Sequence, residues 1–235
     1  MDTAVTPMMQ QYLKIKEEYS DCILFFRLGD FYEMFFDDAL TASKVLEITL
    51  TGKDCGMKER APMCGVPFHS VEGYIARLVK NGYKVAICEQ VEDPKAAKGI
   101  VKRDVIRVIT PGTANIDSVL TNADNNFLSC VYIDDDGCGM SFADVSTGEL
   151  ITTQIDGDVY ETAVMSTLAC FQPAEIAISP GGAKYSKMFA ELNKRFHFYS
   201  EYLQREYFEP EICKKAVCEK FGWQSLSDTP LDGKE

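Results

Sequence analysis

The sequence predicts an α/β protein of two domains, on the strength of its length, its periodicities and its uneven charge. The 235 residues are enough for two ordinary domains, and 46% of them are hydrophobic. Apolar runs of strand length alternate with segments in which apolar residues recur every three or four positions, which is typical of an α/β fold. We expect a first domain at 1–113, a linker rich in Thr, Asn, Asp and Ala at 114–126, and a second domain at 127–235.

The first domain is expected to open with a helix at Pro7, because Thr6 suits the N-cap and proline suits the first helical position. Ser70 is expected to cap a second amphipathic helix that stops at Gly82. Apolar runs predict strands at 22–28, 31–36, 48–51, 84–88 and 105–109, with a further helix at 37–46. Strands and helices in this order predict a mixed-sheet α/β domain.

The second domain is expected to begin with three hairpin-linked strands, at 127–133, 139–145 and 150–155. Asp158 and Glu161 form a capping box for a helix that runs through Cys170. A strand at 174–178 and helices at 184–193 and 210–221 follow. Strands first and an alternation of helix and strand afterwards again predict a mixed sheet.

The segment after Gly29-Asp30, a predicted type II′ turn, is the most informative part of the chain. Alternation along a strand places Phe31, Glu33 and Phe35 on one face and Tyr32, Met34 and Phe36 on the other. An aromatic ring can stack on a base, and a neighbouring carboxylate can bond to one. A glutamate between two phenylalanines conflicts with a simple apolar face, and such conflicts concentrate at functional sites.

Charge, cysteines and hydropathy exclude several classes of protein. Residues 1–113 hold 15 basic and 16 acidic residues, and the remainder hold 9 and 20, so only the first part can approach DNA without strong repulsion. Nine scattered cysteines without C-x-x-C spacing indicate reduced thiols in a cytoplasmic protein rather than disulfides or a zinc site. No apolar run approaches the roughly 18 residues of a membrane span, so we expect no membrane association.

Several motifs of the chain resemble the MutS family of DNA mismatch-recognition proteins. The resemblance covers about the first 150 residues closely, and its motifs lie at 29–35, 62–69, 86–90, 93–94, 98–99, 107, 110–113 and 144–149. It implies a mismatch-recognition domain followed by a ribonuclease-H-like connector without nuclease activity. Members of this family are several times longer, so the chain is expected to be an N-terminal fragment with a truncated connector.

The resemblance also implies roles for individual residues. Phe31 would stack on the mispaired base from the minor groove and Glu33 would hydrogen-bond to it, either accepting from a base or, when protonated, donating to one. Lys53 falls where the family has a basic residue near the phosphate backbone. Implied partners are mismatched or looped double-stranded DNA, MutL and, for the full-length protein, a second MutS subunit, in the bacterial cytoplasm at the nucleoid.

We expect no catalytic residue, metal site or cofactor in this fragment. The sequence has no G-x-x-x-x-G-K-[ST] phosphate-binding loop, so ATP and Mg²⁺ are expected only for the full-length protein.

Two alternatives stay open. One is a protein-interaction module dominated by the acidic second half. The other is a nuclease that uses 134–136 with Asp144, although nearby acids alone do not fix a two-metal geometry. For His69, before the predicted helix cap, we expect a structural hydrogen bond rather than catalysis. Lys58 and Arg60 fit a solvated loop as well as phosphate contacts, and Lys102, Arg103 and Arg107 fit ordinary strand-end charges.

Overall fold

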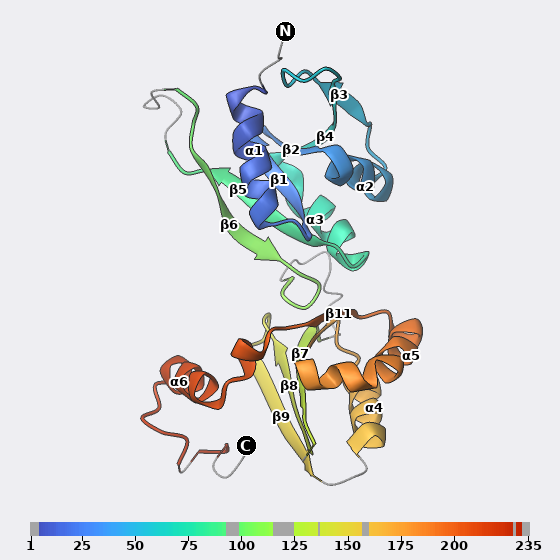
Figure 1. The fold of residues 1–235 in the computed structure, drawn as a ribbon, viewed down its shortest axis with the longest axis vertical. Helices are drawn as coiled ribbons and strands as arrows, with labels where there is room; N and C mark the ends of the chain where they lie inside the picture. Colours follow the sequence, from blue (N-terminus) through green and yellow to red (C-terminus); the bar gives the residue numbers. More distant parts are fainter. Residues whose placement is uncertain are drawn as a thin grey trace. The chain divides into compact units, whose positions relative to one another are not determined.

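The computed structural model describes residues 5–92, 99–114, 125–135, 137–156, 160–227 and 229–231. The chain divides into two compact units between Asp124 and Asn125, and each has its own sheet and core (Figure 1). Most of the predicted linker at 114–126 lies outside the described residues. The predicted capping residue Asp158 lies outside them as well. Among those residues, no helix is both long and apolar enough to cross a bilayer.

The first unit is a six-stranded mixed sheet with helices on both faces. Its order is β3 (Thr51–Lys53), β4 (Ala61–Pro67), β2 (Phe31–Phe35), β1 (Cys22–Leu28), β5 (Lys84–Gln90) and β6 (Arg103–Ile109). Strands β1 and β5 are parallel, and every other neighbouring pair is antiparallel. The helices are α1 (Pro7–Glu18), α2 (Phe36–Leu46) and α3 (Val71–Lys80), with a 3-10 turn, η1, at Phe68–Ser70. The mixed α/β class predicted for this domain is confirmed.

Two separate apolar layers hold this sheet, because side chains along each strand alternate between its faces. Helix α1 packs Met9, Tyr12 and Ile15 against one face, which includes Phe26 and Phe35. Helices α2 and α3 cover the other face, which includes Phe25, Tyr32 and Met34 (Figure 1). With both faces covered, the inner strands β1, β2 and β5 have one exposed residue, the first residue of β2.

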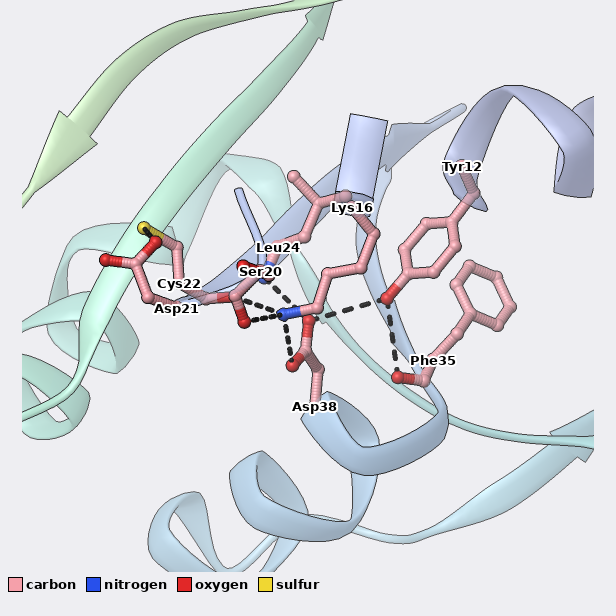
Figure 2. A network of polar contacts seen from close by, with 8 residues as sticks. All are labelled: Tyr12, Lys16, Ser20, Asp21, Cys22, Leu24, Phe35 and Asp38. Carbon is pink, nitrogen blue, oxygen red and sulfur yellow. Dashed lines mark hydrogen bonds and ion pairs between the residues drawn. The ribbon is translucent and has the colours of Figure 1, made fainter. Parts of the chain in front are cut away.

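A buried polar network joins α1 to the start of α2 (Figure 2). The Asp38 carboxylate lies 2.9 Å from Lys16 Nζ and accepts hydrogen bonds from Leu24 N at 2.9 Å and from the Tyr12 hydroxyl at 3.4 Å. Lys16 Nζ also donates to the carbonyl of Cys22 at 2.6 Å. Burial raises the pKa of Asp38 despite these hydrogen bonds, and burial and the charge of Asp38 raise the pKa of Tyr12. The network therefore satisfies polar groups that the apolar layers would otherwise leave unpaired.

The second unit is a five-stranded mixed sheet, which confirms the class predicted for it. Its order is β11 (Tyr199–Tyr202), β10 (Glu175–Ile178), β7 (Phe127–Ile133), β8 (Gly137–Asp144) and β9 (Glu149–Asp156). Strands β7, β8 and β9 form the predicted antiparallel series, and β10 and β11 extend it in parallel. The helical elements are α4 (Tyr160–Phe171), η2 (Pro180–Tyr185), α5 (Ser186–Phe196), η3 (Arg205–Phe208) and α6 (Pro210–Phe221).

One face of this second sheet forms the core of the unit. Helices α4 and α5 pack Val164, Leu168, Phe189 and Leu192 onto it. Figure 1 shows α6 on the other side of the sheet, and none of its residues is buried.

Some local predictions are wrong, each for a physical reason. Ser70 does not cap α3 through its side chain, because its hydroxyl donates to the carbonyl of Pro67. Phe36 does not share the face of Tyr32 and Met34. Its φ of +52° ends the strand, and its ring packs near Tyr12 on the opposite face. The predicted strand at 48–51 is displaced to Thr51–Lys53, and strands β4 and β11 were not predicted.

Candidate nucleic-acid interface

A two-residue turn presents the Phe31 ring at the end of the first sheet. Gly29 has φ +58° while Asp30 has no positive φ, which fits the predicted type II′ turn and explains the glycine at this position. The Asp30 carbonyl accepts a hydrogen bond from Phe68 N at 3.0 Å, so η1 braces the turn. Phe31 is 46% exposed.

Phe31 differs in exposure from the rest of its strand. Tyr32, Met34 and Phe35 are all buried, the first two under α2 and α3 and the third under α1. Tyr32 and Met34, which alternation places on the face opposite Phe31, therefore belong to the core. The backbone of Phe31 is paired with Leu28 on one side and Pro67 on the other, so a large apolar ring stands in solvent on a fixed backbone.

Glu33, two residues along the same face, forms an ion pair with Lys53. Lys53 Nζ lies 2.5 Å from Glu33 Oε2, and the two side chains are 31% and 16% exposed. Lys53 Nζ is also 5.8 Å from the centre of the Phe35 ring. The structure thus places all three sequence-predicted site residues in the first unit and joins two of them directly.

Gly65 lies opposite Glu33 on the neighbouring strand β4. A Cβ added at Gly65 would lie 3.5 Å from Glu33 Cγ and 3.3 Å from the carbonyl oxygen of Tyr32. The distance to the Tyr32 carbonyl is tight and the distance to Glu33 Cγ is an ordinary contact, so a side chain here would crowd the backbone of β2.

Sequence reasoning missed Arg27, which connects the turn to its surroundings. Its guanidinium donates to the Gly29 carbonyl at 2.6 Å, lies 3.7 Å from the centre of the Phe68 ring and pairs with Glu89 at 3.1 Å. The Tyr32 hydroxyl donates to the same Glu89 carboxylate. Burial, this hydrogen bond and the negative charge of Glu89 raise the pKa of Tyr32 to about 12. The only sequence signal was a charged residue near the end of an apolar strand.

The other basic candidates fall into two groups. Arg103 is buried and donates to the Arg27 carbonyl at 2.6 Å and to Gln11 Oε1 at 3.0 Å, and burial lowers its pKa. Its role is structural, not that of a strand-end charge in solvent. Exposed positions are occupied by Lys58, Arg60, His69, Lys102 and Arg107, and the Arg60 guanidinium donates to the carbonyl of Gly52.

Asp144, the key residue of the nuclease alternative, is committed to its own turn. Its Oδ1 accepts hydrogen bonds from the backbone N–H of Ser146 at 2.8 Å and from the Ser146 hydroxyl at 2.6 Å, and Oδ2 accepts one from Asn126 N at 3.1 Å. Burial alone raises the pKa of Asp144, but these hydrogen bonds outweigh it and the pKa is lowered. The part of the chain that the structure describes contains no group of three or more His, Cys, Asp or Glu placed to hold a metal ion.

Comparison with protein families assigns both units. A model described as MutS domain I matches residues 6–118, and one described as MutS domain II matches residues 126–235. The chain belongs to the MutS family. Phe31 and the Glu33–Lys53 ion pair therefore lie in MutS domain I, and the Asp144 turn lies in MutS domain II.

Individual relatives agree with this assignment. The chain is 52% identical over 229 residues to the DNA mismatch repair protein MutS of Acetivibrio thermocellus and 53% identical over 228 residues to that of Ruminiclostridium cellulolyticum. Each match covers 97% of this chain and 26% of the relative. The MutS protein of Alkaliphilus oremlandii is 58% identical over 172 residues, which is 73% of this chain and 20% of that protein. The chain thus spans about a quarter of the length of these relatives.

Proposed function

We propose that this chain recognises and binds mismatched or looped double-stranded DNA through its first unit, as a non-catalytic part of a mismatch repair protein. The observation that carries the proposal is the exposed Phe31 ring, held on a doubly paired strand beside the partly exposed Glu33 carboxylate. Phe31 enters the mispair from the minor groove and Glu33 hydrogen-bonds to the displaced base. Lys53 belongs to the same DNA-facing surface.

The energetics of insertion explain why an exposed ring discriminates between duplexes. Separating a stacked base step costs a few kcal/mol, and the cost is lowest where a base is mismatched. Stacking on the Phe31 ring returns about 1–3 kcal/mol. At a matched step the full cost of opening remains, so the ring detects deformability rather than sequence.

The Glu33 carboxylate adds a second requirement. Near phosphates its charge is unfavourable unless it is compensated, and a base can bond to it only after displacement from its pair. Glu33 thereby weakens binding to a matched duplex and strengthens binding to a duplex with a displaced base.

The full-length protein couples this recognition to other parts and partners. We place ATP and Mg²⁺ in domains outside this chain, because its sequence lacks the G-x-x-x-x-G-K-[ST] phosphate-binding loop. In the proposal the second unit connects to those domains and to MutL, the full-length protein pairs with a second MutS subunit, and the complex acts at the nucleoid in the bacterial cytoplasm.

Phe31→Ala in the full-length protein tests the proposal. Fluorescence anisotropy with a G·T duplex and its matched counterpart should show that the variant loses most of the mismatch preference, about tenfold or more, because the stacking contribution disappears. Circular dichroism should remain that of the wild type, since the ring is exposed. Tyr83→Ala removes another exposed aromatic ring of the first unit and should keep the preference. Retention of the wild-type preference by Phe31→Ala would refute the insertion.

A protein-interaction role is the second candidate, and it concerns the second unit. That part of the sequence carries most of the negative charge. Tyr207 in η3 is 66% exposed, and Ile212 in α6 is 58% exposed. A unit with excess negative charge and exposed apolar side chains suits a protein partner better than a phosphate backbone. Tyr207→Ala with Ile212→Ala in the full-length protein should weaken MutL binding and leave DNA discrimination unchanged if this role is correct.

A further inference from the structure

The Glu33–Lys53 ion pair raises the question of what Lys53 does beside the proposed probe. A lysine that contacts phosphate is usually free to reach outward as a mobile point charge. Lys53 Nζ instead lies 2.5 Å from Glu33 Oε2, and its side chain is 31% exposed. Its ammonium group is therefore directed along the sheet surface toward the carboxylate.

The surrounding backbone fixes this arrangement from both ends. Lys53 is the last residue of β3 and pairs with Ala61, and Glu33 is central in β2 and pairs with Gly65 on β4. Ala61 and Gly65 are four residues apart on β4, so the two long side chains reach each other diagonally over that strand. Gly65 contributes no side chain beside Glu33 Cγ, and Phe35 presents its ring 5.8 Å from Lys53 Nζ. The aromatic face adds a second attraction that keeps the cation in place.

Glu33 depends on this single partner for its orientation. A glutamate side chain has three rotatable bonds, and Lys53 is the one cation within ion-pair distance of Glu33 among the described residues. A carboxylate that must reach a displaced base gains from being held in one position before the base arrives.

We propose that Lys53 is a positioning residue that determines specificity: it holds the Glu33 carboxylate ready for a displaced base, rather than serving chiefly as a phosphate contact. The inference rests on the proposed function, because it assigns a role within the same site. The two roles of Lys53 predict different changes on mutation. A lost phosphate contact weakens binding to every duplex about equally and lowers the salt dependence. A lost positioning contact lowers the ratio of mismatched to matched affinity.

Lys53→Met, Glu33→Ala and the double variant, all in the full-length protein, test the proposal. Anisotropy titrations with G·T and matched duplexes at two salt concentrations give the affinity ratio, from which uniform electrostatic effects cancel. Lys53→Met should lower the ratio of mismatched to matched affinity about fivefold, because it removes a partly buried ion pair. The ratio should then approach that of Glu33→Ala. In the Glu33→Ala background, Lys53→Met should leave the ratio unchanged to within about twofold.

Two further variants separate positioning from general damage. Lys53→Arg keeps a cation within reach of Glu33 and should restore most of the ratio that Lys53→Met loses. Lys44→Met removes an exposed lysine from α2 and should leave the ratio as in the wild type. Should Lys53→Met unfold, as judged by circular dichroism, Lys53→Gln serves in its place.

The proposal is overturned if Lys53→Met lowers both affinities equally with a shallower salt dependence, because Lys53 would then be a phosphate contact. It is also overturned if Lys53→Met lowers the ratio further in the Glu33→Ala background. A wild-type protein without mismatch preference, or a Phe31→Ala variant that keeps it, would instead refute the proposed function itself.

Discussion

Glu33 in the first unit and Asp144 in the second are both acidic residues on strands, yet their surroundings are opposite. Asp144 is 2% exposed; donors of Ser146 in its own turn bond to Oδ1, and the backbone N–H of Asn126 bonds to Oδ2. Within the described part of the chain Glu33 has one cation, on one oxygen, and its side chain is 16% exposed. Asp144 is fully used by the fold, whereas Glu33 keeps capacity to accept a bond from another molecule.

In this pair, the structural carboxylate is both more deeply buried and bonded by more internal partners than the carboxylate proposed to bind DNA. Asp38 extends the comparison, because it lies in the same unit as Glu33 but resembles Asp144. It accepts bonds from a cation, a backbone N–H and a hydroxyl at once. Substitutions at or beside these three acids should therefore affect stability at two sites and DNA binding at the third.

The largest effect is expected from Lys16→Met, which leaves Asp38 without its cation. Removing one partner of a buried pair should lower the free energy of unfolding by about 3 kcal/mol, measured by urea denaturation. Burial already raises the pKa of Asp38, and the loss of Lys16 raises it further. A raised folded-state pKa means that stability is lost as pH rises, so the penalty should be larger at pH 7 than near pH 4.

Lys14→Met on the same helix is the matched control, since Lys14 is exposed. It should unfold as the wild type does. An equal penalty for both lysines would show that Asp38 does not need its cation.

A smaller loss is expected from Asp144→Asn in the second unit. The amide offers one acceptor oxygen where Ser146 and Asn126 N each bond to a different oxygen, so the free energy of unfolding should fall by about 2 kcal/mol. The pKa of Asp144 is lowered in the folded protein, so its contribution is present above the unfolded pKa and is lost as pH falls. The difference between variant and wild type should therefore shrink below about pH 4.

Asp135→Asn is the control for this substitution, because Asp135 is exposed and pairs only with the exposed Lys184 among the described residues. It should leave the unfolding transition unchanged. A stable Asp144→Asn variant would mean that the turn hydrogen bonds are dispensable and that the contrast with Glu33 is false.

The smallest effect is expected from Glu33→Ala, which should not destabilise the first unit measurably. It should raise affinity for matched duplex about threefold, because a negative charge disappears and Lys53 becomes free to approach phosphate. Anisotropy with matched duplex at low and moderate salt measures the gain. Glu17→Ala, at an exposed position on α1, should show no such gain, and unchanged matched-duplex affinity in Glu33→Ala would contradict the penalty assigned to this charge.

Local patterns were sufficient to predict elements with strong periodicity or continuous burial. The strand at Cys22–Leu28 and the helix at Pro210–Phe221 have their predicted bounds, and the helix at Val71–Lys80 follows its apolar spacing. Strand β4 was missed because Pro62, Gly65 and Pro67 are typical of loops. Proline and glycine are tolerated there near strand ends and beside a partner side chain. Strand β11 was missed because it is a short, largely polar edge strand.

In the candidate site, too, features within one strand were predicted, whereas contacts between strands distant in sequence were not. Alternation along one strand was enough to separate Phe31 from the buried Tyr32 and Met34. The Lys53–Glu33 contact depends on the order β3-β4-β2, which no local pattern encodes. The role of Arg27 likewise depends on η1 and β5 meeting the turn.

Strand β2 is flanked by hydrogen-bonded neighbours along both edges, and its first residue carries the exposed ring. The backbone that carries this ring is held on both sides, so it cannot shift away from a bound base. In the proposed insertion the nucleic acid supplies nearly all of the movement, so differences in how readily a base step opens become differences in the lifetime of the complex.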